Sequence, residues 1–214
     1  MQDNLPIYGK IVRRCEEFLE EHGDNFRGVG WTKGQHEADA RYQTMLELIR
    51  PQASDTSVTL LDFGCGAAHL YEYILQHGLE KRIAYTGLDV SAPFLSLSRG
   101  KFPDVMFLEH DILQSPEPLP IFDYVVCNGI FTMKCDLSFE SMMQYCEAAI
   151  SKLFAAARIG LAFNVMSKQV EWERDDLFHV PFDTMATFLT NHLSRNFVFR
   201  HDYRLYEYTT YVYH

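Results

Sequence analysis

The segment Leu60 to Gly66, which reads L-L-D-F-G-C-G, constrains the fold of this chain more than any other. An apolar run ends there in Asp62 and turns through Gly64 and Gly66 into a helix-like segment over 67–77. Glycines at such a turn let the backbone bend sharply and let a ligand approach it without a Cβ in the way. The segment therefore predicts the strand–turn–helix opening of a nucleotide-type cofactor site.

Strand-like and helix-like runs alternate along the rest of the chain. The strand-like runs cover 57–62, 83–88, 105–109, 122–127, 158–165, 196–201 and 206–213. The helix-like runs among them cover 67–77, 92–100, 139–157 and 182–193. Alternation of this kind predicts a parallel sheet with helices on both faces and a ligand beyond the carboxyl ends of the strands. The last two strand-like runs have no helix between them, which predicts a closing antiparallel hairpin.

Two more helices are predicted ahead of this core. Residues 5–22 carry apolar side chains at helical spacing, and residues 35–50 have the pattern of a second helix. A glycine-bearing loop joins the two. We expect residues 1–50 to form an N-terminal helical cap and residues 51–214 to form the core, within one compact domain overall.

Composition narrows the classes of partner. The formal net charge is −10, whereas a protein that grips a nucleic-acid backbone usually shows a basic face, so we expect no nucleic-acid partner. No apolar run approaches the ~20 residues that span a bilayer, and no signal-peptide pattern opens the chain. Five scattered cysteines without a C-x-x-C pair suggest neither a metal site nor disulfides. We expect a cytoplasmic protein without membrane or metal, and take it to be a monomer or homodimer.

Four short motifs, in order, resemble those of the class I S-adenosylmethionine-dependent methyltransferases. The acidic-x-Gly-x-Gly motif of that family is matched by Asp62-Phe63-Gly64-Cys65-Gly66, and an acid at the end of the second strand by Asp89. An acid after the third strand is matched by Asp111, and the fourth motif by the run that ends in Asn128-Gly129. The resemblance implies an α/β fold with a Rossmann-like, seven-stranded, mostly parallel sheet, an antiparallel last strand, helices on both faces and an N-terminal helical cap.

The resemblance also implies a set of cofactor-binding residues at the ends of the first four strands. Asp89 would accept hydrogen bonds from both ribose hydroxyls, and Asp111 would face the adenine amine. The set implied in the core is Asp62, Gly64, Cys65, Gly66, Asp89, Val90, Asp111, Ile112, Asn128 and Gly129. A structural turn, a helix cap or a plain strand end remains the alternative role at each of these positions.

The predicted cap adds further candidates. Trp31 lies in the glycine-bearing loop, where a ring can fold over a sulfonium by cation–π attraction; an anchor for the loop is the alternative. Arg41 could form a bidentate pair with the cofactor carboxylate, or it could be a surface arginine on a helix. Tyr8 lies on the apolar face of the first helix and is a candidate either for the substrate site or for the core.

Methyl transfer places few demands on catalytic side chains. It is a direct displacement at an activated carbon, so the enzyme has to align acceptor, methyl and sulfur and exclude water. A general base is needed only where the acceptor loses a proton. His36, His69 and His201 are the candidates, and each could instead be structural. His69 also stands where a dinucleotide fingerprint requires its third glycine, which favours S-adenosylmethionine over a nicotinamide cofactor.

The predicted function is therefore transfer of a methyl group from S-adenosylmethionine to an O or N atom of a small-molecule acceptor, with S-adenosylhomocysteine as product. Two alternatives stay open. One is an NAD-dependent Rossmann oxidoreductase, and the other is a catalytically silent cofactor-binding regulatory protein. The motifs do not identify the acceptor.

Overall fold

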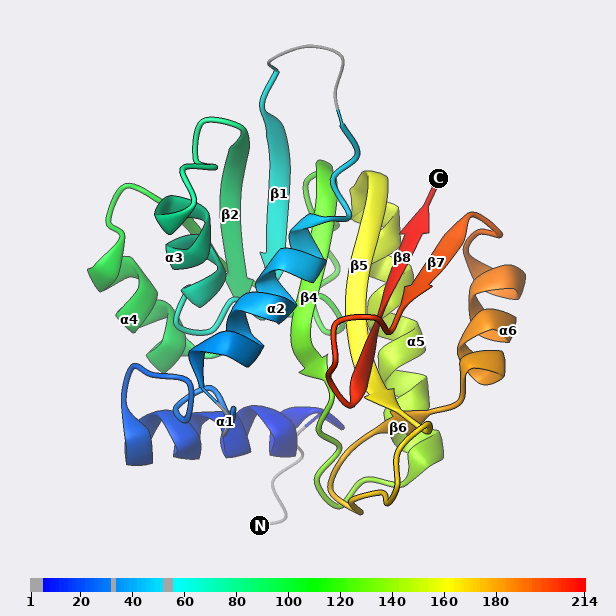
Figure 1. Ribbon diagram of the computed structural model, residues 1–214. Helices are drawn as coiled ribbons and strands as arrows, with labels where there is room; N and C mark the ends of the chain where they lie inside the picture. The colour runs from blue at the N-terminus through cyan, green and yellow to red at the C-terminus, as the bar shows by residue number, and fades with distance from the viewer. Residues whose placement is uncertain (1–5, 32–33, 52–55) are drawn as a thin grey trace.

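Strands β1 to β5 of the computed structural model form a parallel sheet, which β8 extends by antiparallel pairing with β5 and β7 extends by antiparallel pairing with β8 (Figure 1). The structure describes residues 6–31, 34–51 and 56–214. The strands are β1 Val58–Phe63, β2 Ile83–Asp89, β3 Met106–Glu109, β4 Phe122–Phe131, β5 Ala157–Ser167, β6 His179–Val180, β7 Phe197–Arg200 and β8 Glu207–Tyr213. The helices are α1 Gly9–His22, α2 Gln35–Leu46, α3 His69–Gln76, α4 Ala92–Lys101, α5 Phe139–Ala156 and α6 Phe182–His192. Among the described residues, no helix has both the length and the apolar character needed to cross a membrane.

The order of the strands is β3-β2-β1-β4-β5-β8-β7, and β8 runs antiparallel to both of its neighbours. The predicted mostly parallel sheet with an antiparallel last strand is confirmed, and each of the seven predicted strands is present. The structure adds β6, a strand of two residues that pairs with the end of β5. A pair of residues has no periodicity of its own, so the sequence pattern could not indicate it.

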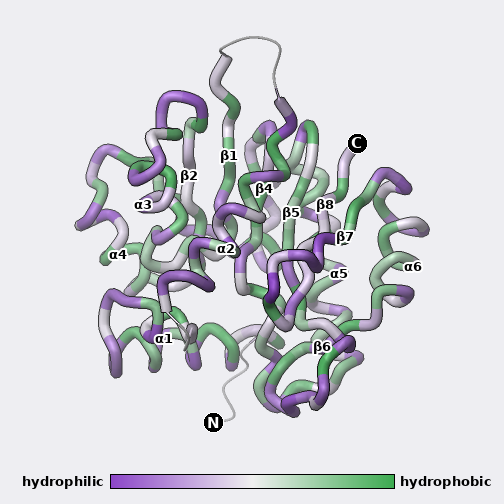
Figure 2. Tube along the Cα trace, viewed as in Figure 1, coloured by the Kyte–Doolittle hydropathy of each residue, from purple (hydrophilic) through white to green (hydrophobic). Residues whose placement is uncertain are grey.

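Alternate residues of the central strands point into two separate cores. On β4, Val125 and Cys127 pack with α5 and α6, whereas Tyr124 and Val126 pack with α2 and α3. This period of two is the one expected of a sheet buried on both faces. Figure 2 shows hydrophobic stretches along the strands and hydrophilic ones on the helices and connecting loops. The predicted helices on both faces are thus confirmed.

The second helix ends earlier than its apolar pattern predicted. It was expected to run to residue 50, but α2 ends at Leu46 and is followed by a tighter turn, in which the N–H of Ile49 donates to the carbonyl of Leu46 at 3.0 Å. Two tyrosines of β8 hold the carbonyl groups released there. The hydroxyl of Tyr211 donates to the Thr44 carbonyl, and that of Tyr213 donates to the Leu48 carbonyl at 3.1 Å. The last strand therefore takes over the capping that a helix end needs.

The two N-terminal helices lie against different parts of the core. Helix α1 runs beneath the carboxyl ends of the parallel strands, and α2 packs on β4 and α3 (Figure 1). The first helix was predicted over 5–22; residue 5 lies outside the described residues, and α1 begins at Gly9 after a turn over 6–8. A division of the chain at residue 50 stays a prediction, and the structure shows that α2 contributes to one of the two cores.

Replacing Met45 by alanine tests the contribution of α2 to the core. Met45 is 0% exposed, so we expect Met45→Ala to lower the free energy of unfolding by about 2–5 kcal/mol through lost burial and a residual cavity. Met106 on β3 is 62% exposed, so Met106→Ala is the matched control. We expect it to change the free energy of unfolding by about 0.5 kcal/mol or less. Urea unfolding followed by circular dichroism measures both. Equal losses in the two variants would show that α2 is a peripheral helix.

Candidate active site

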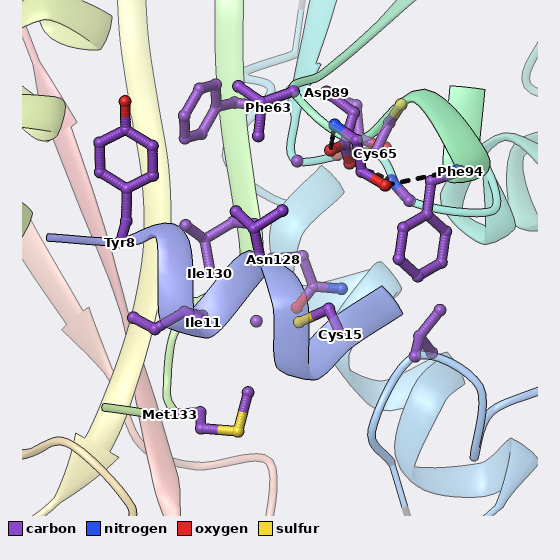
Figure 3. A pocket seen from close by; sticks show the side chains of 18 of the residues that line it. Tyr8, Ile11, Cys15, Phe63, Cys65, Asp89, Phe94, Asn128, Ile130 and Met133 are labelled. Carbon is purple, nitrogen blue, oxygen red and sulfur yellow. Dashed lines mark hydrogen bonds between the residues drawn. The ribbon is translucent and has the colours of Figure 1, made fainter. Parts of the chain in front are cut away.

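One cavity lies where β1, β2 and β4 end, at the point where the strand order reverses (Figure 3). Its empty space is about 1180 Å³, including the open mouth. Helix α1 forms one wall with Ile11 and Cys15, and Asp89 and Phe94 lie on the side away from Tyr8. All of the predicted cofactor-binding residues line this cavity except Arg41. A switch point of a parallel sheet is where such folds bind their ligands.

The glycine turn after β1 has a conformation that side chains oppose. Gly64 has φ +71°, and a Cβ there would lie 1.9 Å from Cδ1 of Ile130. Gly66 has φ +52°, and its N–H donates to Oδ2 of Asp89 at 2.9 Å. The turn is folded onto β2, because the N–H of Gly64 also donates to the Leu88 carbonyl at 2.7 Å. Two of the four sequence motifs are thus joined by a hydrogen bond.

Asp89 holds the local structure and keeps acceptor capacity. Its Oδ2 accepts from Gly66, and its Oδ1 accepts from the N–H of Ser91 at 2.9 Å. An ionised carboxylate offers about four acceptor positions, so each oxygen can take one more hydrogen bond. Burial raises the pKa of Asp89, and the backbone N–H groups oppose that rise only in part. The helix cap itself is Ser91, whose Oγ accepts from the Phe94 N–H at 3.5 Å.

Asp62 is a buried acid with one hydrogen-bond donor among the described residues. It is 3% exposed, and the hydroxyl of Tyr85 donates to its Oδ2 at 2.8 Å. Burial raises the pKa of Asp62 to about 7, and the Tyr85 hydrogen bond opposes the rise. None of the described residues that line the cavity is a lysine or arginine. A cationic group of a ligand would therefore find an uncompensated acid here.

Asp111 ties the loop after β3 to α1. Its Oδ1 accepts from the N–H groups of Leu113 and Gln114, at 3.0 and 3.1 Å. The hydroxyl of Tyr8 donates to its Oδ2, and the Tyr8 ring stacks on Tyr145 with centroids 5.2 Å apart. Both oxygens thus have structural partners, and Oδ2 keeps room for another donor. Tyr8 is buried and also lines the cavity, and its role in a substrate site stays a prediction.

The end of β4 brings Gly129 against the N-terminal loop. Gly129 has φ +84°, and a Cβ built on it would lie 3.5 Å from Nε1 of Trp31. Its N–H donates to Oδ1 of Asn164 at 2.8 Å. Because the peptide is planar and trans, the carbonyl of Asn128 points the opposite way from that N–H. The side-chain oxygen of Asn128 is buried and has no hydrogen-bond partner among the described residues.

The two candidates from the cap have different positions. Trp31 lines the cavity and packs beside Tyr42, with ring centroids 5.6 Å apart. Arg41 is not in the cavity wall; its Nε donates to both carboxylate oxygens of Glu207 at 3.0 Å. Arg41 was expected to pair with the cofactor carboxylate or to be a surface arginine; in the structure it pairs instead with a buried carboxylate of the protein. Sequence spacing gave no signal for this pair, because 166 positions separate the two residues.

Only one of the three candidate histidines reaches the cavity. His36 is exposed on α2, and His201 is exposed after β7. His69, at the start of α3, lines the cavity with Nε2 2.8 Å from Oδ1 of Asp24. Its Nδ1 is buried without a hydrogen-bond partner among the described residues.

Sequence reasoning missed most of the apolar wall. The residues concerned share apolar or aromatic side chains on α1, α4, α5, the end of β4 and the segment after it; they are Ile11, Val12, Cys15, Phe94, Ile130, Met133 and Tyr145. Apolar side chains that face a cavity have the same periodicity as those that face the core, so no pattern separates them.

Comparisons with known proteins agree with this geometry. A family model described as a methyltransferase domain matches residues 61–160. A Mycobacterium tuberculosis protein whose name assigns it to the methyltransferases is 28% identical over 153 residues, which is 71% of this chain and 90% of that protein.

Two solved structures share the fold. Magnesium protoporphyrin IX methyltransferase from Synechocystis PCC 6803, solved with bound S-adenosylmethionine, has a TM-score of 0.63 at 15% identity, covering 100% of this chain and 99% of that one. An S-adenosylmethionine-dependent methyltransferase from Leishmania major has a TM-score of 0.63 at 13% identity, covering 99% and 87%. Identities this low show a common fold.

Asp62→Asn tests the buried acid through the pH dependence of stability. The folded pKa of about 7 lies above the unfolded value of about 3.9, so the acid costs increasing stability as the pH rises from about 4 to 7. We expect Asp62→Asn to be more stable than the unaltered chain at pH 8, by a few kcal/mol, and nearly equal to it near pH 4.5. Urea unfolding of the unliganded proteins at both pH values measures the difference.

Asp123→Asn is the matched control, with the opposite sign. Burial raises the pKa of Asp123, but hydrogen bonds from Thr59 and the ion pair with Arg158 outweigh that effect and lower it overall. Its stabilisation is therefore present above the unfolded pKa and is lost as the pH falls through the folded one. Asp123→Asn should lose stability at pH 8. A loss of similar size in Asp62→Asn would contradict the raised pKa of Asp62.

Proposed function

We propose that this chain is a class I methyltransferase that transfers the methyl group of S-adenosylmethionine to an O or N atom of a small-molecule acceptor. The observation that carries the proposal is the convergence of four sequence motifs on one cavity. Asp62 on β1, Asp89 at the end of β2 and Asp111 after β3 are far apart in the chain and line the same cavity. S-adenosylhomocysteine is the product that leaves.

The residues present suit this cofactor. Asp89 keeps an acceptor position on each oxygen, which matches the two hydroxyls of a ribose. Asp62 lacks a cationic partner among the described lining residues, and the ammonium of the methionine portion would supply one. Asp111 and Ile112 would flank the adenine. The Synechocystis enzyme that shares the fold was solved with this cofactor bound, which supports the assignment.

The cavity wall favours an uncharged or cationic acceptor over an anionic one. Its described residues include three aspartates and no lysine or arginine, and aromatic and aliphatic side chains form most of the rest. Phosphates and nucleic-acid backbones are normally met by basic groups. The formal net charge of −10 also disfavours an anionic acceptor. All five cysteines are free, which suits a reducing compartment such as the cytoplasm.

The protein contributes mainly alignment and exclusion of water. Bound S-adenosylmethionine supplies an already activated methyl group, so no nucleophile of the chain is required. Where the acceptor has to lose a proton, His69 is the histidine that the fold brings to the cavity. Asp24 holds its Nε2, which leaves Nδ1 as the ring atom able to accept a proton.

Asp89→Asn tests the cofactor site. The unaltered chain should bind S-adenosylmethionine and S-adenosylhomocysteine, and the variant should bind them about 10- to 100-fold more weakly, because a charged acceptor is lost. Isothermal titration with each ligand and with NAD measures this. Binding of NAD alone, or of none of the three, would contradict the proposal.

Asp123→Asn again provides a matched control. Asp123 is also a buried aspartate that accepts from a backbone N–H, but it lies at the opposite end of the parallel sheet and does not line the cavity. Its substitution should leave the affinity for S-adenosylhomocysteine unchanged. An equal loss in both variants would show that Asp89→Asn acts through general destabilisation.

A further inference from the structure

We infer that Arg41, Glu207 and Asn164 form a buried polar relay that positions two neighbouring parts of the cavity wall, the Trp31 ring and the Gly129 peptide. None of the three relay residues lines the cavity. They are positioning residues, and the chemistry stays with the groups they hold. The inference rests on the proposed function because it assumes that the cavity binds S-adenosylmethionine.

Glu207 is the centre of the relay. It is the first residue of β8 and is 2% exposed. Its Oε1 accepts from Nε of Arg41 at 3.0 Å and from Nδ2 of Asn164 at 2.8 Å, and its Oε2 lies 3.0 Å from Nη2 of Arg41. A buried carboxylate persists when its charge and its lone pairs are both satisfied. Here Arg41 of α2 supplies the positive charge, and Asn164 of β5 supplies a further hydrogen-bond donor.

One arm of the relay runs through Arg41 to Trp31. The guanidinium carbon lies 4.8 Å from the centre of the Trp31 ring. A planar guanidinium can stack on an aromatic face while its edge donates to a carboxylate, and a lysine ammonium cannot do both in the same way. Glu207 thereby fixes the guanidinium, and the guanidinium supports the ring that faces the cavity.

The other arm runs through Asn164 to Gly129. The Glu207 carboxylate only accepts and the Gly129 N–H only donates, so a single orientation of the Asn164 amide satisfies both, with Nδ2 toward Glu207 and Oδ1 toward Gly129. The carbonyl of Gly129 in turn accepts from Oγ1 of Thr132 at 2.9 Å. Asn164 thus holds the Asn128–Gly129 peptide through its N–H, and Thr132 holds the next peptide through its carbonyl. Because the Asn128–Gly129 peptide is planar and trans, the Asn128 carbonyl faces away from Asn164.

The two arms meet again at the cavity. Nε1 of Trp31 lies 3.5 Å from the position that a Cβ on Gly129 would occupy. One buried carboxylate on the last strand therefore sets both the ring from the N-terminal loop and the peptide from the end of β4. Loosening either arm should impair ligand binding even where the fold survives.

The experiment uses Trp31 as its own reporter. The chain has two tryptophans, and Trp172 is 70% exposed, so Trp172→Phe leaves Trp31 as the single tryptophan, which can be excited selectively over the tyrosines. Arg41→Lys and Asn164→Ser are made in this background and titrated with S-adenosylhomocysteine. We expect each to raise Kd by about 10- to 100-fold, the effect of a small misplacement at a binding site. Only Arg41→Lys should also change the emission of unliganded Trp31.

Arg200→Lys is the matched control. Arg200 of β7 pairs with Glu47, just after α2, at 2.7 Å, and its guanidinium lies 6.0 Å from the Tyr211 ring. Like Arg41, it joins the α2 region to the β7–β8 hairpin through an ion pair and an aromatic ring, but it does not line the cavity. Its Kd should stay within about twofold of the unaltered chain.

A double variant separates positioning from stability. Arg41→Gln with Glu207→Gln removes both charges of the pair together, whereas either single substitution leaves the other charge without its partner. Its thermal midpoint should recover relative to either single substitution, while its affinity stays low. Recovery of affinity along with the midpoint would overturn the inference.

The remaining outcomes separate the two proposals. If the unaltered chain binds S-adenosylhomocysteine and the relay variants bind it as tightly as Arg200→Lys does, the relay inference alone fails. If the unaltered chain does not bind, the proposed function fails and the inference fails with it.

Discussion

The hydrogen bond from the Gly66 N–H to Asp89 joins the ends of β1 and β2, and the remaining geometry of the cavity follows from it. It requires the turn after β1 to fold back over the sheet, which a residue with a Cβ at Gly64 would prevent by meeting Ile130. The second oxygen of Asp89 holds Ser91, where α4 begins. One carboxylate thus sets the turn, the strand end and the start of a helix, and it still faces the cavity.

This arrangement buries a carboxylate at the cavity, which is energetically unfavourable. Asp62 and Asp123 are both buried aspartates on adjacent parallel strands, yet the pKa of Asp62 is raised and that of Asp123 is lowered. The difference lies in their partners, because Asp123 has Thr59 and Arg158 whereas Asp62 has the Tyr85 hydroxyl. A charge left without a cation at the ligand end is a destabilising feature that a cationic ligand relieves, as expected of sites shaped for binding.

Features that depend on local pattern could be predicted from the sequence. The strand and helix periodicities gave every element except β6, and the glycine and aspartate motifs located the cavity because parallel strands bring their carboxyl ends to one edge. Contacts between residues that are far apart in the sequence could not be predicted. Arg41 with Glu207, and Asn164 with Gly129, are pairings between ordinary polar residues that no spacing rule connects. The early end of α2 could not be predicted for the same reason, because tyrosines of the distant strand β8 donate to the carbonyl groups at that helix end.

The last strand has a larger part in the site than its distance from the motifs indicates. Helix α2 is held to β8 by Tyr211, Tyr213 and the Arg41–Glu207 pair, so the end of the chain fixes a helix near its beginning. The motif end of the cavity is built from β1 to β4, while its other walls come from α1 and the Trp31 loop. Substitutions in these N-terminal walls can reshape the apolar side of the cavity without changing the carboxylates at its motif end. The relay through Glu207 limits that freedom, because Trp31 and Gly129 have to move together.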